Sequence, residues 1–511
     1  MKLHTIPSGI SGVAALINSF FMDICRRRFS ALLAGAVSAP VWAASNRPKL
    51  TVLLLVEELR ADALDSVFPQ LATGGFRRLA ARAAWFPTCR HLSSTFSATG
   101  IANLATGAWP AQHGIVADSW YDRPSRTTVR ASTESLLATT LAAQAADDAA
   151  MRVAVVAMSR SHAALFAGTP HASLYFLDDA GHYAAAGPAP DWLAAFNAAH
   201  TPEQFNGANW MAVNAVAGAP PLRTLHVDDD HRSEFLARYR ASPFAQMAAF
   251  DLAAELLVRD KLGQGTTSDL LCIVDQSAAL LGYAEGARSP LMNQMVLQLD
   301  RRIETLLDQL AGTVGENGFN LVVSAAHGAP PCPAPESRAR MAVNGETVAQ
   351  AVETALKGSG RHVEKYVYPF VYLDRAATLN TAEPIRRMAA EAALTQPPVA
   401  GFYTAGGACS TTGEWQRRFQ NSFHPQRSGD VMLSYRPEYV EDTGAGRGIS
   451  YGSLYNYDAC VPLFLYGPQF RAAVFETPVD AVDLAPTLAR ALGIAEPSSA
   501  VGRVLSEALI A

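Results

Sequence analysis

The chain has 511 residues, of which 49% are hydrophobic and 17% are charged. This composition excludes a disordered protein, and the length allows one large α/β domain with insertions or two to three domains. The formal net charge of −5 gives no reason to expect nucleic acid or an anionic membrane surface as a partner.

The N-terminal segment has the features of an export signal. Arg26, Arg27 and Arg28 precede a mildly apolar stretch at 31–39, and small residues near Ala43 suit signal-peptidase cleavage. The apolar stretch is too short to span a membrane, so we expect no transmembrane segment. Paired arginines before such a stretch suggest twin-arginine export of residues 45–511 to the periplasm or medium, with 1–44 as the signal. The alternative to an export signal is that the basic residues precede an apolar stretch by chance.

The six cysteines do not define a metal site or a disulfide framework. Five of them follow the expected signal, and their spacings resemble no metal knuckle. An odd number leaves at least one thiol free unless it pairs between chains. One disulfide in an oxidising compartment is compatible with the sequence, but its partners cannot be assigned.

The central feature of the sequence is the apolar run 50–56, bounded by charge at both ends. Such a run is typical of a strand buried on both faces of a parallel sheet. Glu57 and Glu58 follow it directly, at the edge where open α/β sheets collect ligands and catalytic groups. An acidic residue there is placed to hold a metal.

The remaining pattern alternates strands with helices. Further strands are expected at 153–158, 270–274, 320–324, 367–373 and 463–466, and helices at 75–83, 101–106, 348–356 and within 479–493. This order predicts a three-layer α/β/α core with a mostly parallel central sheet, and cap regions inserted at about 168–242 and 330–440. The Asp- and His-containing stretch 228–232 is interpreted as a solvated loop rather than a metal site.

A polar stretch, 93–100, leads into the helix expected at 101–106. Small hydroxyl residues at such a turn can expose a nucleophile beside the backbone N–H groups of a helix N-terminus. Taken alone, the stretch is more typical of an ordinary helix cap.

Several short motifs occur between Leu50 and Leu505. They are V-E-E-L-R-A-D (56–62), A-T-G-A-W-P-A-Q-H-G-I-V (105–116), S-W-Y-D (119–122), L-D-R-R-I (299–303), A-A-H-G-A (325–329), N-S-F-H-P-Q-R-S-G-D-V (421–431), Y-N-Y-D (455–458) and D-L-A-P-T-L (483–488). In this order they resemble the alkaline phosphatase superfamily, in particular its bacterial phosphate-monoesterase and nucleotide pyrophosphatase/phosphodiesterase branch. The resemblance implies an α/β/α fold over nearly the whole mature chain.

The resemblance also implies a site for two zinc ions, held by aspartates and histidines around a Ser or Thr nucleophile. Two metals would clamp the attacking and leaving oxygens of an in-line displacement. The nucleophile position falls on Ser97, the first-strand aspartate on Glu57, and one histidine on His327. The other four ligand positions carry side chains that cannot replace carboxylate and imidazole: Ala279, Tyr283, Ala326 and Tyr451. We therefore expect no zinc cofactor here, although active relatives use it.

The substrate-contacting positions also depart from the family pattern. The phosphate-binding asparagine falls on Asp118, whose charge would repel phosphate. A Lys-x-Arg pair falls on Ser159 and Ser161, with Arg160 between them, and a shift of one residue in this alignment would restore one cation.

Three functions are compatible with these observations. The leading one is an exported homologue that has lost two-zinc phosphoesterase activity and binds a ligand or protein partner, with Tyr283 and Tyr451 lining an apolar pocket. The second is an active phosphate-ester hydrolase with a rebuilt site, in which Ser97, His327 and Asp275 or Asp118 act with Glu57. The third is a structural or interaction protein that uses its caps.

Overall fold

The computed structural model describes residues 47–226, 231–330, 342–374, 379–437, 439–441 and 451–510. The chain divides into two units, Met1–Asn46 and Arg47–Ala511, and every described residue belongs to the second. The expected export signal and most of the stretch 228–232 lie outside the described residues.

A ten-stranded sheet forms the core, with β1 (Leu50–Val56) in its interior. The strands follow the order β19-β2-β18-β11-β1-β10-β5-β6-β7, and β20 pairs with β2. Their bounds are β2 Ala84–Arg90, β5 Val153–Ala157, β6 Ser173–Leu177, β7 Tyr183–Ala185, β10 Asp269–Asp275, β11 Phe319–Ser324, β18 Cys460–Tyr466, β19 Ala473–Val474 and β20 Val479–Asp480. Because β11, β1, β10, β5 and β6 are mutually parallel, the predicted mostly parallel sheet is confirmed. The expected strand at 463–466 is present in β18, but it runs antiparallel to β11.

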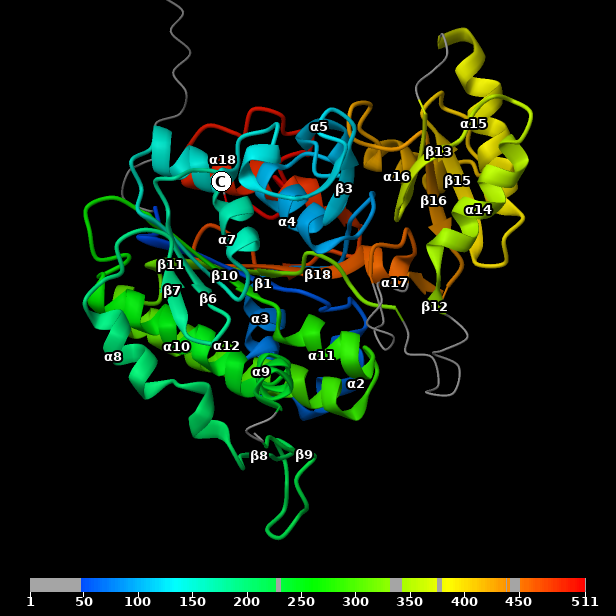
Figure 1. Ribbon diagram of the computed structural model, residues 1–511. Helices are drawn as coiled ribbons and strands as arrows, with labels where there is room; N and C mark the ends of the chain where they lie inside the picture. Colours follow the sequence, from blue (N-terminus) through cyan, green and yellow to red (C-terminus); the bar gives the residue numbers. More distant parts are fainter. Residues whose placement is uncertain are drawn as a thin grey trace, which may run out of the picture. The chain divides into compact units, whose positions relative to one another are not determined.

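Helices cover both faces of this sheet (Figure 1). One layer contains α2 (Ala63–Val67), α3 (Phe76–Arg82), α10 (Pro243–Arg259), α11 (Ser277–Glu285) and α12 (Pro290–Val314). The opposite layer contains α4 (Ser97–Thr106), α5 (Pro110–His113), α7 (Arg160–Ala167) and α18 (Leu484–Leu492). The three-layer α/β/α architecture expected from the sequence is therefore confirmed. The helix expected at the end of the chain also stops where predicted, because Gly493 takes the left-handed φ of 64° that favours glycine.

The register of the central strands brings three chain segments to one edge of the sheet. Val56 lies opposite Asp275, and Leu55 lies opposite Ser324. The Glu57 N–H continues the ladder by donating to the carbonyl of Asp275 at 2.9 Å, and the Glu58 N–H donates to the carbonyl of His327 at 3.0 Å. The ends of β1, β10 and β11 are thus fixed side by side.

The region expected as the first insert begins by extending the core, because β6 and β7 add to the central sheet. It continues with short elements: α8 (Trp192–Ala199), β8 (Asn209–Trp210), β9 (Arg223–Thr224) and α9 (Arg232–Arg240). A further helix, α6 (Leu141–Ala143), precedes β5, and α17 (Asn456–Ala459) precedes β18.

The second insert forms its own antiparallel sheet, in the order β13-β14-β16-β15. Its elements are β12 (Ala342–Val343), α14 (Gly345–Leu356), β13 (Val363–Val367), β14 (Phe370–Leu373), α15 (Leu379–Leu394), β15 (Val399–Thr404), α16 (Glu414–Ser422), β16 (Val431–Tyr435) and β17 (Val440–Glu441). The single strand expected at 367–373 is wrong. The chain turns at Tyr368–Pro369, a cis peptide bond, and Val367 pairs with Phe370 across a hairpin.

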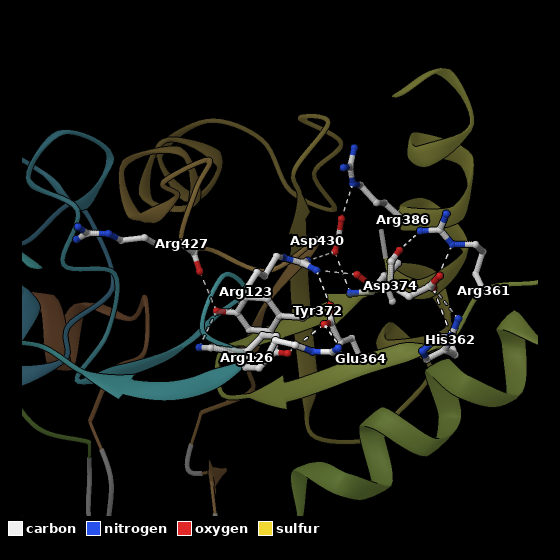
Figure 2. A network of polar contacts seen from close by, with 12 residues as sticks. Arg123, Arg126, Arg361, His362, Glu364, Tyr372, Asp374, Arg386, Arg427 and Asp430 are labelled. Carbon is white, nitrogen blue, oxygen red and sulfur yellow. Dashed lines mark hydrogen bonds and ion pairs between the residues drawn. The ribbon is translucent and has the colours of Figure 1, made fainter. Parts of the chain in front are cut away.

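Arg123 connects this small sheet to a hairpin of the core, β3 (Ser119–Asp122) and β4 (Thr127–Arg130). Its guanidinium donates to Glu364 at 2.9 Å and to the carbonyl of Leu373 at 2.8 Å, and it also pairs with Asp430 (Figure 2). Asp430 in turn accepts from Arg386 at 2.9 Å. Because the Arg123 side chain is 8% exposed, removing its carboxylate partners would leave a desolvated charge, so this contact fixes the cap to the core.

Among the described helices, none combines the length and apolar character needed to cross a membrane. The described cysteines, Cys89, Cys272, Cys409 and Cys460, are free thiols, so no disulfide forms among them.

Candidate functional site

Three of the residues singled out in the sequence meet at the edge of the central sheet. Glu57 follows β1, Ser97 is the first residue of α4, and His327 follows β11. The Ser97 hydroxyl lies 2.8 Å from Glu57 Oε2 and 2.9 Å from His327 Nε2. All three side chains are buried, with at most 1% of each exposed. The structure thus brings together three residues that the sequence singled out separately.

His162 is a site residue that the sequence analysis missed. It lies in the first turn of α7, and its Nδ1 is 2.9 Å from Glu57 Oε1. Burial alone would raise the pKa of Glu57, but His162 and His327 outweigh burial and hold this pKa well below its usual value. Burial would lower the pKa of His162, yet the Glu57 carboxylate raises it overall. The raised pKa of His162 favours an imidazolium that pairs with the buried Glu57 carboxylate.

The Ser97 hydroxyl has three hydrogen-bonding neighbours, Glu57, His327 and the Tyr451 phenol, and the first two compete for its proton. The Nδ1 of His327 lies 2.6 Å from the Gly328 carbonyl, which can only accept, so Nδ1 carries a hydrogen. If the ring is neutral, Nε2 accepts from Ser97 and can serve as a base. If the Ser97 hydroxyl donates to Glu57 instead, Nε2–H must donate to Ser97 and the ring is an imidazolium. Only the first arrangement activates Ser97 through His327.

Asp118 occupies the place where α4 could otherwise receive an anion. Its Oδ1 accepts from the backbone N–H of Ala98 at 2.9 Å. The free N–H groups and the dipole at a helix N-terminus favour a negative group. Burial raises the pKa of Asp118 above its usual value, and the Ala98 N–H opposes this rise. The Asp118 carboxylate thus accepts from the Ala98 N–H, which could otherwise donate to phosphate.

Asp275 does not complete a Ser–His–Asp triad with Ser97 and His327. Its carboxylate accepts from Gln246 Nε2 at 2.6 Å and from the N–H of Ser277 at 2.9 Å. The Nδ1 of His327, which a triad carboxylate would contact, faces the Gly328 carbonyl instead.

The four substituted ligand positions supply no metal-binding group of the expected kind. Ala279 and Ala326 are buried methyl groups, and Tyr283 lies half-buried on α11. Tyr451 stacks on the His327 ring at a centroid distance of 4.1 Å, where it fills space beside the imidazole. Within the described part of the chain, no group of three or more His, Cys, Asp or Glu side chains is arranged to hold a metal ion. The donors present do not fit a two-zinc site.

Close packing of α4 against β11 depends on Gly100. A Cβ at this position would lie 1.8 Å from the carbonyl oxygen of Ala326. The absence of a side chain therefore lets the helix carrying Ser97 approach the segment that carries His327.

Glu58 is a second buried acid beside this site. It is 4% exposed and has a left-handed φ of 66°, which non-glycine residues rarely adopt. Neither carboxyl oxygen has a hydrogen-bond partner among the described residues. Burial, followed by the charges of Asp458 and Glu57, raises the pKa of Glu58 well above its usual value, and Arg60 opposes this rise.

Residues 159–161, on which the Lys-x-Arg pair of the family pattern falls, also direct no cation at Ser97. Ser159 and Ser161 contact each other at 2.8 Å, and the Arg160 guanidinium lies 5.4 Å from the centroid of the Phe176 ring. The charge of Arg160 is thus placed over an aromatic face of β6.

Residues 51–448 match the family model of type I phosphodiesterase / nucleotide pyrophosphatase. The chain belongs to this family. The sequence is 23% identical to the alkaline phosphatase PhoV of Synechococcus elongatus, over 91% of this chain and 93% of that protein. It is also 23% identical to the alkaline phosphatase PafA of Elizabethkingia meningoseptica, over 94% and 97%. The crystal structure of wild-type PafA superposes with a TM-score of 0.80 at 22% identity, covering 91% of this chain and 99% of that one.

These comparisons confirm the superfamily and the fold that the motifs predicted. They place the chain among phosphoesterases over almost its full length. The structural likeness, at this identity, concerns the fold alone.

Proposed function

We propose that this chain is an exported member of the family that does not hydrolyse phosphate esters by the two-zinc route and instead binds a ligand near the former active site. One observation carries the proposal: the groups retained at the site bind each other. Glu57 is bonded to Ser97 and His162, and Asp118 holds the Ala98 amide. Metal and phosphate would have to displace these internal partners.

The energetic scale supports the same conclusion. Enzymes typically lower an activation barrier by about 8–23 kcal/mol, and a two-metal site supplies a large part of this in phosphoryl transfer. A zinc ion normally takes three or four protein ligands. Of the six family positions, Glu57 and His327 alone keep a carboxylate or an imidazole, and the His162–Glu57 ion pair already balances one charge.

The test is metal analysis and turnover on the same protein preparation. Protein purified from its native compartment is assayed for zinc by mass spectrometry, then for hydrolysis of aryl phosphate mono- and diesters with zinc added. We expect substoichiometric zinc. We also expect no Ser97-dependent turnover, so the wild type and Ser97→Ala should have the same background rate. Stoichiometric metal together with Ser97-dependent turnover would overturn the proposal. Thr106→Ser, a buried hydroxyl at the other end of α4, serves as a matched variant for protein quality.

The 2.9 Å contact between Ser97 and His327 favours one alternative, a metal-free hydrolase. A base within this distance of a hydroxyl can take its proton during attack on an ester. Two features count against it: the Nδ1 of His327 faces the Gly328 carbonyl rather than a carboxylate, and the Ala98 N–H, a natural oxyanion donor, is taken by Asp118. A fluorophosphonate probe decides between the two. Labelling that is lost in Ser97→Ala and in His327→Gln would establish the hydrolase.

The exported location is part of the proposal and rests on the N-terminal arginines. We expect replacement of Arg26 and Arg27 by lysine to retain the protein in the cytoplasm, since twin-arginine export depends on this pair. Fractionation of cells expressing the wild-type and substituted chains measures this. Unchanged export of the substituted chain would contradict it.

A further inference from the structure

Three buried polar side chains form a hydrogen-bond chain through α4. Asn103 lies in α4, His113 is the last residue of α5, and His91 directly follows β2. None of the three side chains has exposed surface. Because an unsatisfied polar group is costly when buried, the contacts of these side chains determine which nitrogen carries each hydrogen.

Backbone groups anchor both ends of the chain. The N–H of Ile115 donates to His113 Nδ1 at 3.0 Å, so Nδ1 has no hydrogen and Nε2 carries the one of this ring. At the other end, His91 Nε2 lies 3.0 Å from the carbonyl of Ala325, which can only accept. His91 Nε2 therefore carries a hydrogen, and in a neutral ring Nδ1 is left to accept.

The amide of Asn103 joins the two neutral rings in one orientation only. His113 Nε2 donates to Asn103 Oδ1 at 2.9 Å, and Asn103 Nδ2 donates to His91 Nδ1 at 3.2 Å. The opposite orientation would let Nδ2 donate to the carbonyls of Thr99 and Ala108, each at 3.2 Å, but would turn Oδ1 toward His91 Nδ1. Both nitrogens of His91 would then have to carry hydrogens, so that orientation requires a charged ring.

The surroundings of the two rings oppose such a charge. Burial lowers the pKa of His91 to about 4, and the facing His327 adds to this fall. Burial, followed by the charges of Arg427 and His424, lowers the pKa of His113 to about 3. Both rings are therefore neutral at pH 7, and the chain runs in one direction from the Ile115 N–H to the Ala325 carbonyl.

The chain ends at the segment that carries His327. Ala325 directly follows β11 and lies two positions before His327. Asn103 belongs to α4, the helix that begins at Ser97. The chain and the 2.9 Å contact between Ser97 and His327 thus connect the same two segments.

We propose that Asn103 is a positioning residue, which holds Ser97 against His327 by linking α4 through the neutral His91 ring to the Ala325 carbonyl. Its amide suits this role because it donates to one ring and accepts from the other, which neither a carboxylate nor an apolar side chain can do. The inference goes beyond the proposed function, since the contact is held in the same way whether the site binds a ligand or hydrolyses an ester.

The first measurement is NMR of the histidine ring nitrogens in the full mature chain at pH 7. Replacing His91, His113 and His327 in turn with glutamine assigns their resonances. We expect a hydrogen on Nε2 and none on Nδ1 in both His91 and His113. A hydrogen on Nδ1 of either ring would overturn the proposal, because the chain would then not run through Asn103 in the stated direction.

The second measurement follows the His327 Nε2 resonance, which reports the contact with the Ser97 hydroxyl. Ser97→Ala gives the resonance of a ring without this contact. Asn103→Leu, which cuts the chain, should move the His327 resonance toward its position in Ser97→Ala. Thr106→Ser, a buried change in the same helix, should leave the resonance in place. An unmoved His327 resonance in folded Asn103→Leu would overturn the positioning role.

Asn103→Asp keeps the size of the side chain and decides the proposal should Asn103→Leu not fold. A carboxylate can only accept, so His91 would have to donate to it from Nδ1 while Nε2 still donates to Ala325. We therefore expect hydrogens on both nitrogens of His91 at pH 7 in this variant, whereas the wild-type ring is neutral. A neutral His91 ring in Asn103→Asp would overturn the proposal, since it would mean that residue 103 does not hydrogen-bond to His91.

Discussion

The buried carboxyl of Glu58 makes a quantitative prediction about stability and pH. The pKa of Glu58 in the folded chain is raised well above the usual value of 4.5, chiefly by burial. In the unfolded chain it ionises near 4.5, so above that pH the unfolded state loses a proton that the folded state keeps. Each pH unit between 4.5 and the raised pKa therefore lowers the free energy of unfolding by about 1.4 kcal/mol.

Replacing Glu58 by glutamine removes this penalty while keeping the size of the side chain and the left-handed backbone. Between pH 5 and pH 7 the variant should gain stability on the wild type by up to about 2.7 kcal/mol, which is two pH units at about 1.4 kcal/mol each. The difference in unfolding free energy between the two proteins excludes the contribution of other groups whose pKa burial raises, such as Asp275.

The measurement is urea unfolding, followed by tryptophan fluorescence, at pH 5, 6 and 7. Glu476→Gln, at an exposed position, is the matched control and should follow the wild-type curve at every pH. Parallel curves for the wild type and Glu58→Gln would refute the reasoning, since they would mean that Glu58 ionises alike in both states.

Four further predictions concern the site and its surroundings. His162→Gln should destabilise the fold by about 3–5 kcal/mol in urea unfolding, because it removes a cation from the buried Glu57 carboxylate. Glu57→Gln should cost less, because His162 then loses its proton instead of staying charged. The double variant should lose clearly less than the sum, and additive losses would contradict the ion pair. Asp118→Asn should strengthen calorimetric binding of inorganic phosphate at least about tenfold by removing a negative group from the start of α4, and unchanged binding would refute this. Burial lowers the pKa of His91 to about 4 and of His113 to about 3. Each ring should therefore cost about 1.4 kcal/mol of stability for each pH unit below 6.5, down to its lowered pKa. In His91→Gln the free energy of unfolding should fall less steeply as the pH is lowered. Dialysis against EDTA should leave the melting temperature unchanged, whereas a large fall would reveal a structural metal.

The central sheet could be predicted because burial on both faces leaves a direct trace in the sequence. The apolar run that became β1 has all seven residues buried, and β10 and β11 have the same pattern. The same reasoning placed Glu57 at the edge of the sheet where ligands collect, whereas Ser97 and His327 were singled out through the family resemblance. The hairpin at Tyr368–Pro369 did not, because apolar residues continue on both sides of the turn.

The role of His162 could not be read from the sequence, because its partner lies 105 positions away and α7 sets the orientation of its side chain. The only signal was its place just after β5, a strand that ends at the same edge of the sheet. The tyrosine cluster around Tyr451, which contains Tyr368, Tyr435, Tyr439 and Tyr457, was missed for a similar reason. Tyr451 was singled out, but the other four rings come from the inserted sheet and the segment before β18, which only the fold brings together.

In the proposed function, side chains of this chain occupy the places where an active family member would hold a metal ion and a phosphate group. In the proposed function, Glu57 stands at the position of a metal ligand and pairs with His162 instead of a cation from solution. The amide end of α4, suited to a phosphate oxygen, holds the Asp118 carboxylate. If the proposed function is correct, these internal contacts satisfy groups that would otherwise be costly when buried, and the fold needs neither metal nor substrate to be stable at this edge. It follows that restoring a lost ligand singly, for example by Ala326→Asp, should destabilise the chain before it restores zinc, because the new carboxylate would be buried beside Glu57 without a cation.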